Sequence, residues 1–193
     1  MLIKKEEDPS AEYWKNKHIF IEKDILYVLG EFNQDVSNNV IPKMQEILSS
    51  LSQTVDPQFE IVINSPGGYT TELLSILFYL DLMKKQGIKI ITKNIGEACS
   101  CGAMLACYGD VRYMGSRSTF LLHYGQFPVP PFTNMEDIDR LSNSARDDFE
   151  LTLELYAKHS NLKKDKLRKL LQSDHLRLDA KTCLEYGFVD HII

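Results

Sequence analysis

The spacing of apolar residues divides the chain into short strand-like runs and longer helical stretches that follow one another. Runs rich in β-branched and aromatic residues predict strands over residues 25–32, 59–63, 88–95 and 188–193, and residues 111–124 hold further strand material around residues 115–117. Helices are predicted over residues 38–51, 72–85, 101–107, 137–158, 163–171 and 179–186. Strands that alternate with helices in this way favour an α/β domain.

Proline and glycine residues support several of these boundaries. Pro42 can stand in the first turn of the first helix, where the N–H that proline lacks has no partner in any case. Gly87 and Gly187 follow two predicted helices and are typical of helix C-termini. Residues 1–17 are polar and predict a flexible N-terminal arm. Because no repeat or linker interrupts the rest, we expect a single domain over residues 18–193.

The composition is that of a globular domain, since 44% of the 193 residues are hydrophobic and 25% are charged. A net charge of −5 gives no electrostatic basis for binding nucleic acid. No run approaches the roughly 18 consecutive apolar residues of a transmembrane helix, and the first residues lack the apolar run of a signal peptide. We therefore expect a cytoplasmic protein with neither a membrane nor a nucleic-acid partner.

Three of the four cysteines, Cys99, Cys101 and Cys107, lie within nine positions, and the fourth is Cys183. A zinc site usually combines C-x-x-C pairs with further ligands at a set distance, and that pattern is absent, so no metal is expected. Small buried thiols in a reducing cytoplasm are the favoured interpretation.

Two glycine-marked turns carry the candidate chemistry, and each directly follows an apolar strand. In the first, residues 64–68 (NSPGG), glycines can expose backbone N–H groups with no side chain in the way. In the second, residues 96–103 (GEACSCGA), Ser100 stands at a strand-to-helix junction among small residues. Such a junction lifts a hydroxyl out of the sheet and directs N–H groups at the oxyanion that forms on an acyl carbonyl.

A serine hydroxyl needs a base to become a nucleophile at neutral pH. His123 has the best setting of the five histidines, because it follows the apolar residues 120–122 and precedes a glycine-containing turn. Taken singly, a serine before a small-residue helix is usually a cap and a histidine after a strand usually packs. The order of turn, serine junction and histidine favours nucleophilic catalysis.

In that order, residues 63–68, 96–103 and 121–123 resemble motifs of the Clp protease proteolytic subunit, as do residues 180–190 near the C-terminus. The resemblance covers roughly residues 18–193. It implies a Clp/crotonase-type αβ spiral fold with a protruding helix–strand handle. It also implies a peptidase that cleaves peptides or unfolded proteins inside a homo-oligomeric ring, without metal or cofactor.

The resemblance also implies the role of each site residue. Ser100 would be the nucleophile, His123 the general base, and the backbone N–H groups of Gly68 and Cys101 the oxyanion donors. The family places an aspartate a few residues before its last helix, and counting back from Ala180 without a gap reaches His175 instead.

A one-residue shift in the preceding loop restores Asp174 as the third member of the triad. We favour Asp174, because a carboxylate holds the imidazole tautomer and stabilises the imidazolium, which a histidine does poorly. His175 remains the alternative.

Two departures from the family pattern leave other interpretations open. Residues 127–132 are rich in proline, which removes the donors that would pair with substrate as an added strand. The N-terminal arm lacks the family's axial-loop sequence. An ATP-dependent unfoldase is therefore an open alternative as a partner. The alternatives are a catalytically inactive ring subunit and a crotonase-type acyl-CoA enzyme. The presence of both Ser100 and His123 speaks against the acyl-CoA enzyme.

Overall fold

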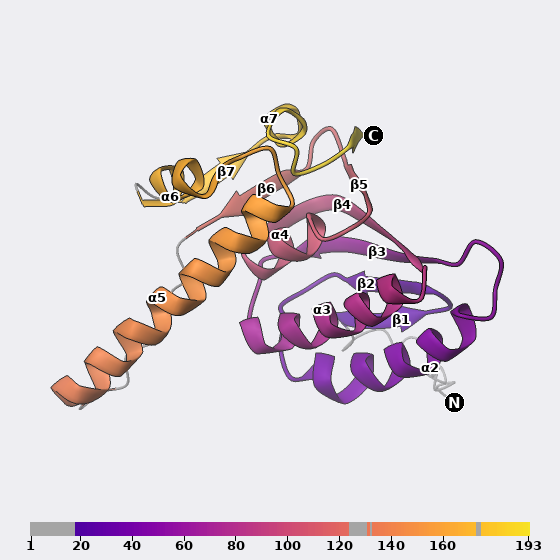
Figure 1. Ribbon diagram of the computed structural model, residues 1–193, viewed down its shortest axis with the longest axis horizontal. Helices are drawn as coiled ribbons and strands as arrows, with labels where there is room; N and C mark the ends of the chain where they lie inside the picture. Colours follow the sequence, from indigo (N-terminus) through magenta and orange to yellow (C-terminus); the bar gives the residue numbers. More distant parts are fainter. Residues whose placement is uncertain (1–17, 124–130, 132, 173–174) are drawn as a thin grey trace, which may run out of the picture.

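The computed structural model describes residues 18–123, 131, 133–172 and 175–193, and the predicted arm over residues 1–17 lies outside them. A twisted sheet forms the centre of this part of the chain, and helices pack against it (Figure 1). Among the described residues, none of the helices combines the length and the apolar character that a membrane crossing requires.

The strands are β1 Ile19–Glu22, β2 Ile25–Val28, β3 Gln58–Ser65, β4 Lys89–Cys99, β5 Val111–Met114, β6 Thr119–Leu122, β7 Leu176–Leu178 and β8 His191–Ile192. The helices are the π-helical turn η1 Val36–Val40, α2 Ile41–Leu51, α3 Thr70–Lys85, α4 Cys101–Ala106, α5 Met135–Lys158, α6 Lys164–Gln172 and α7 Ala180–Glu185. Strands and helices alternate through most of the chain, so the predicted α/β fold class is confirmed.

The sheet follows the order β1-β2-β3-β4-β5-β8, and β2 to β5 and β8 pair in parallel. Strand β4 has two successive neighbours on one side. Its residues Ile91–Asn94 pair with β5, whereas Glu97–Cys99 pair with β6. Strand β7 then adds to β6 in antiparallel orientation. The carboxyl end of β4 is thereby held between β3 and β6.

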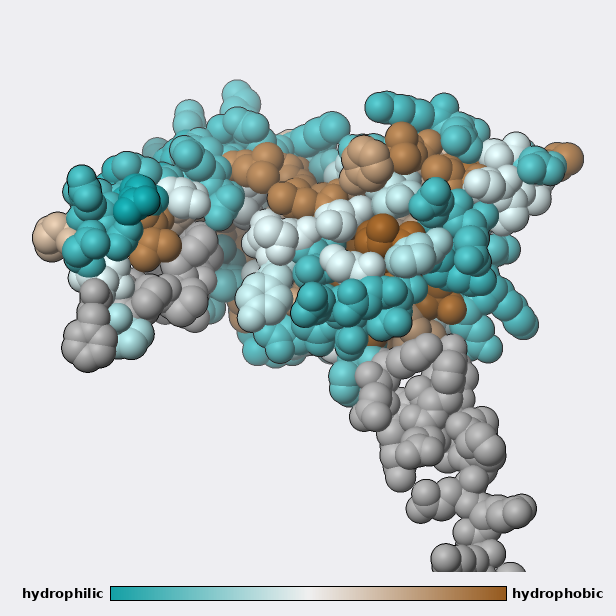
Figure 2. All heavy atoms as spheres, turned by 90° about the horizontal axis from the view of Figure 1, so that it is seen from below, coloured by the Kyte–Doolittle hydropathy of each residue, from teal (hydrophilic) through white to brown (hydrophobic). Residues whose placement is uncertain are grey.

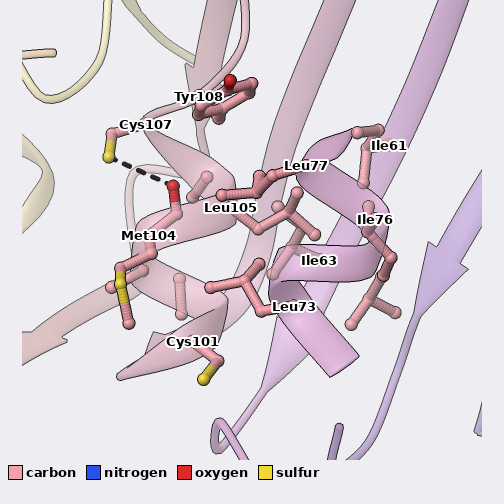
Figure 3. Packing of buried hydrophobic residues seen from close by; sticks show 14 of the residues in the cluster. Ile61, Ile63, Leu73, Ile76, Leu77, Cys101, Met104, Leu105, Cys107 and Tyr108 are labelled. Carbon is pink, nitrogen blue, oxygen red and sulfur yellow. Dashed lines mark hydrogen bonds between the residues drawn. The ribbon is translucent and has the colours of Figure 1, made fainter. Parts of the chain in front are cut away.

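The main core lies between the sheet and the helices α2, α3 and α4. Ile61 and Ile63 of β3 are fully buried against Leu73 and Ile76 of α3, and Leu105 of α4 closes the same cluster (Figure 3). The small residues of α4 let this helix approach the sheet closely, and all of its residues are buried. The end of β4 and the start of α4 are thus embedded in packed side chains.

Helix α5 projects away from the body of the protein (Figure 1), as the helix of the expected handle would. The proline-rich residues expected beside it, 127–132, lie outside the described residues except Pro131. On the face that carries α2 and α3, apolar patches interrupt a mostly hydrophilic surface (Figure 2). The exposed apolar residues of α3 include Leu74 and Phe78.

Two of the predicted strand boundaries that the structure corrects lie close to the glycine turns. The strand over 88–95 was expected to give way to a turn at Gly96, but β4 continues to Cys99 because β6 and Ser65 supply further hydrogen-bonding neighbours. The strand over 25–32 ends at Val28, and Phe32 instead forms an isolated bridge with Gly68. Both differences arise from long-range pairing that local spacing does not encode.

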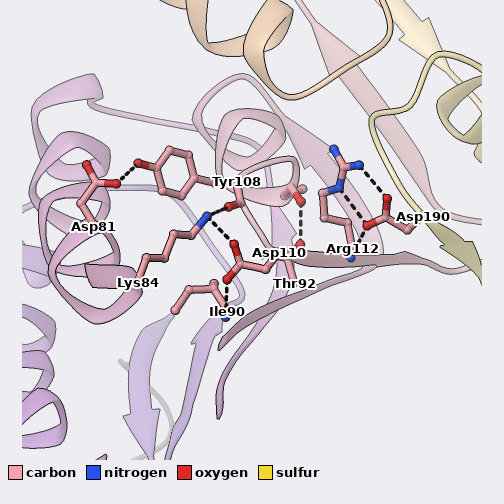
Figure 4. A network of polar contacts seen from close by, with 9 residues as sticks. Asp81, Lys84, Ile90, Thr92, Tyr108, Asp110, Arg112 and Asp190 are labelled. Carbon is pink, nitrogen blue, oxygen red and sulfur yellow. Dashed lines mark hydrogen bonds and ion pairs between the residues drawn. The ribbon is translucent and has the colours of Figure 1, made fainter. Parts of the chain in front are cut away.

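Polar contacts hold β5, and the residues just before it, against the neighbouring elements (Figure 4). The guanidinium of Arg112 donates to both oxygens of Asp190, at 2.7 and 3.0 Å, and to the carbonyl of His159 at 2.7 Å. Lys84 donates to the carbonyl of Tyr108 at 2.7 Å and pairs with Asp110 at 3.0 Å. These contacts join the ends of α3 and α5 to the sheet.

His159 gives this region a dependence on pH. Its ring lies 4.9 Å from the Tyr108 ring, and burial, assisted by the charges of Lys84 and Lys158, lowers its pKa to about 4. An unfolded histidine titrates near 6.5, so the folded state binds fewer protons between these values. The stabilisation is therefore complete above about pH 6.5 and is lost as the pH falls toward 4.

We expect the urea midpoint of unfolding to fall between pH 7.5 and pH 5 in the wild type, and to fall less in His159→Phe. Phenylalanine keeps a ring against Tyr108 but takes up no proton. His191→Phe serves as the control, because His191 is an exposed histidine on β8. If His159→Phe and the wild type lost equal stability over this range, burial of His159 would not be the cause.

Candidate active site

Ser100 occupies the single residue between the end of β4 and the start of α4. Its backbone angles, φ 53° and ψ −118°, lie in a region that residues with a side chain rarely adopt. The Ser100 N–H donates to the carbonyl of Leu121 in β6 at 2.9 Å, and its carbonyl accepts from the N–H of Met104 at 3.0 Å. Hydrogen bonds from β6 and to α4 thus hold the strained turn from both sides.

The first glycine turn lies directly against this serine. Gly67 has φ +105°, and a Cβ built on it would stand 2.7 Å from the Cβ of Ser100 and 3.4 Å from its Oγ. Gly68 has φ +137°, and a Cβ there would be 2.4 Å from the carbonyl oxygen of Phe32. Only glycine fits these two positions, because both the backbone angle and the available space exclude a side chain.

Hydrogen bonds hold the first turn against Phe32 and against the second turn. The Phe32 N–H donates to the Gly67 carbonyl at 2.7 Å, and the Tyr69 N–H donates to the Phe32 carbonyl at 2.8 Å. The thiol of Cys101 donates to the carbonyl of Gly68 at 3.2 Å. Within the described part of the chain, neither the N–H of Gly68 nor that of Cys101 donates to another residue.

His123 directly follows β6 and lines the same small pocket as Ser100. The structure therefore brings together the two residues that the sequence selected as nucleophile and base. Tyr156 of α5 closes the pocket, and its hydroxyl donates to the carbonyl of Ser100 at 3.5 Å. Burial raises the pKa of Tyr156 well above its ordinary value, so the phenol stays protonated.

Helix α5 supplies a wall of the pocket that the sequence analysis did not assign to a site. The pocket residues from this helix are Ala145, Asp148, Phe149, Thr152 and Tyr156. All of them except Asp148 follow the helical spacing of one face of α5, which is a signal for packing rather than for a pocket. Asp148 carries no such signal, and it brings a half-buried carboxylate into the space beside Ser100 and His123.

Of the two candidates for the third triad position, only His175 lies within the described residues. Asp174 lies outside the described residues. His175 lies beside His123, with the two ring centroids 5.3 Å apart and 3° between the ring planes. The side chain of His175 is exposed, whereas Nδ1 of His123 is fully buried.

The cysteines next to Ser100 are poor nucleophiles in this setting. All four cysteines are free thiols, and only Cys99 is not fully buried. Burial raises the pKa of Cys101, and burial together with Glu97 raises the pKa of Cys99. Because a thiol reacts as its thiolate, both groups are held in the unreactive form at neutral pH. The predicted buried thiols are thus confirmed for Cys101, Cys107 and Cys183.

The fold and this pocket define an α/β protein with a serine–histidine site at the carboxyl end of a parallel strand. A family model described as Clp protease matches residues 9–193, so the chain belongs to the Clp protease family, whose members are serine peptidases.

The chain is similar to two curated proteins of this family. It is 25% identical over 171 residues to the ATP-dependent Clp protease proteolytic subunit of Lactococcus lactis subsp. cremoris, covering 88% of this chain and 82% of that protein. It is 27% identical over 190 residues to ATP-dependent Clp protease proteolytic subunit 2 of Streptomyces coelicolor, covering 98% and 81% respectively. The resemblance inferred from the motifs is therefore confirmed.

The close approach of Gly67 to Ser100 generates a prediction. We expect Gly67→Ala to lower the free energy of unfolding by about 2–4 kcal/mol and to slow labelling of Ser100 by a fluorophosphonate at least tenfold. Gly87→Ala is a matched control, because Gly87 also has a positive φ, +79°, but no atom within 4 Å of an added Cβ. The control should lose about 1 kcal/mol and label normally. Equal behaviour of the two variants would show that contact with Ser100 does not explain Gly67.

Proposed function

We propose that this protein is a serine endopeptidase that cleaves peptides or unfolded proteins through an acyl-enzyme. The observation that carries the proposal is the pocket in which the strained Ser100 turn and His123 meet, with Gly67 against Ser100. Membership of the Clp protease family supports the same reaction. The chemistry needs no cofactor, because the chain supplies a nucleophile, a base and backbone donors.

In the proposed reaction, His123 takes the hydroxyl proton of Ser100 while Oγ attacks the substrate carbonyl carbon. The carbonyl oxygen becomes an oxyanion, which accepts hydrogen bonds from the N–H groups of Gly68 and Cys101. His123 then gives its proton to the leaving amine as the C–N bond breaks. A water molecule that His123 deprotonates attacks the ester, which releases the acid product and restores Ser100.

The two proposed donors suit this role because they belong to the two turns that meet at Ser100. Neither N–H donates to another described residue, and the thiol of Cys101 holds the Gly68 carbonyl in place. Asp174 is proposed as the third triad member. Its carboxylate would accept the proton on Nδ1 of His123 and stabilise the imidazolium that forms during attack.

We propose further that the subunits assemble into a homo-oligomeric ring in the cytoplasm and that an ATP-dependent unfoldase delivers substrates. Both relatives are named as subunits of an ATP-dependent protease. A groove of about 410 Å³ between α3 and α5 offers apolar surface for a neighbouring subunit. It is lined in part by Leu74, Phe78 and Leu151, which are 42%, 59% and 45% exposed.

Replacement of Ser100 tests the enzymatic proposal. We expect Ser100→Ala to lower peptide hydrolysis by a factor on the order of a million, because only binding and oxyanion stabilisation remain. Asp174→Asn should lower it about 10⁴-fold through loss of tautomer control. Ser142→Ala, an exposed serine of α5, should hydrolyse at the wild-type rate. If Ser100→Ala hydrolysed peptide at the wild-type rate, Ser100 would not be the nucleophile. If the wild-type protein did not react with a fluorophosphonate, it would be an inactive ring subunit.

Light scattering tests the assembly. The wild type should have the mass of several 22.2 kDa subunits at micromolar concentration, because the exposed apolar groove suits a subunit contact. Phe78→Asp should shift the population toward smaller species. Val55→Asp should leave it unchanged, because Val55 is 93% exposed and does not line the groove. A wild-type monomer would contradict the ring.

A further inference from the structure

Strands β6 and β7 bring two histidines into register. Their antiparallel pairing sets Leu121 opposite Arg177 and Leu122 opposite Leu176. One further step along this register sets His123 opposite His175. Directly opposed residues of antiparallel strands lie on the same face with their Cβ atoms about 5 Å apart. The pairing of the two strands therefore places the His175 side chain beside His123.

The two imidazoles lie parallel, with 3° between their planes and 5.3 Å between their centroids. Nδ1 of His123 is buried, whereas the His175 side chain is exposed to solvent. The proposed general base thus has a second proton-binding group in contact with it. At this separation, a positive charge on one ring opposes a positive charge on the other.

We infer that His175 is a positioning residue for His123: its ring holds the His123 imidazole in place, and its charge keeps His123 unprotonated to lower pH. The inference rests on the proposed function, because it assigns His123 as the general base. A parallel ring restricts the directions in which a small imidazole can turn, and precise placement of the base is worth up to a hundredfold in rate.

Among the described residues, other charged and titratable groups lie on three elements around this pair. Asp148 and Tyr156 of α5 line the pocket of His123, Arg177 of β7 lies two residues from His175, and its charge acts with that of Glu97 on Cys99 at the end of β4. The positive charge of Arg177 disfavours a second proton on the two histidines, and the carboxylates of Glu97 and Asp148 favour it. These groups are unchanged in variants of His175, so a comparison of such variants isolates the contribution of His175.

The direction of the effect follows from coupled titration. When two interacting histidines share the first proton, full protonation of either requires more acid than a single histidine would. In His175→Phe the ring remains but does not titrate, and its face favours a nearby cation. His123 should then be protonated at higher pH, so the acid limb of kcat/KM should move up by about 0.5–1 pH unit.

The test is the pH profile of kcat/KM for a fluorogenic peptide, measured for the wild type, His175→Phe and His175→Ala. His175→Phe should keep the plateau near pH 8 within about threefold and lose activity near pH 6. His175→Ala should lower the plateau about tenfold, because no ring supports His123. His191→Phe is the matched control, since His191 is exposed and stacks on Tyr113 at 5.0 Å, yet does not line the pocket.

Two outcomes of this series would overturn the inference. An acid limb in His175→Phe within about 0.2 pH unit of the wild type would exclude coupling between the rings. A full plateau in His175→Ala would exclude a positioning role. A merely structural role of His175 would lower all rates in proportion and leave the acid limb in place, which also contradicts the inference.

A second measurement separates failure of this inference from failure of the proposed function. In Ser100→Ala, the Cε1 signal of His123 in histidine-labelled protein should titrate in two steps, and in Ser100→Ala with His175→Phe in one step at higher pH. This readout needs no hydrolysis. If Ser100→Ala showed the two-step titration but the wild type did not hydrolyse peptide, the peptidase proposal would be wrong and the coupling of the two histidines would stand. One-step titration with His175 present would overturn the inference itself.

Discussion

The site depends on the way in which β4 pairs first with β5 and then, along the same side, with β6. The first half of the strand pairs with β5 and the last residues pair with β6, so the strand end is carried past β5 and delivered beside the strand that precedes His123. The hydrogen bond from the Ser100 N–H to Leu121 continues this pairing into the turn. Without β6 at that place, nothing in the described sheet would hold Ser100 in its unusual backbone conformation.

The close packing of α4 serves the same end from the other side. Its residues are all buried, and its small side chains let the helix start immediately after Ser100. A Cβ on Gly102 would stand 3.0 Å from the carbonyl oxygen of Ser65, so the helix also presses against the strand that leads into the first glycine turn. Sheet, helix and turn therefore share one small volume, and rigidity there is a property of the fold rather than of any single residue.

Much of this arrangement could be predicted from the sequence, because it depends on the spacing and type of residues that are close together in the chain. Alternating strands and helices predict the fold class, and the glycines at 67 and 68 predict an unusual turn. Ser100 and His123 stand at strand ends, where short side chains and apolar flanks make them conspicuous. The family resemblance added the expectation that these separate features meet, and they do line one pocket.

The remaining features depend on pairing between distant segments, which local spacing does not encode. The extension of β4 to Cys99 requires β6, and the contact between His123 and His175 requires the register of β6 with β7. Counting back from Ala180 leads to His175 as well, but a gap in a loop can be placed in more than one way. Asp148 was missed because a charged residue among others on a long helix carries no sign of what it faces.

The order in which these segments occur along the chain bears on the synthesis of the protein. Ser100 and His123 have both been translated by residue 123, but a wall of their pocket comes from α5 and the neighbour of β6 comes from β7, at Leu176–Leu178. A nascent chain still attached to the ribosome thus exposes an unfinished pocket. Because such long-range pairing forms late, the proposed hydrolysis should begin only after nearly all of the polypeptide has emerged.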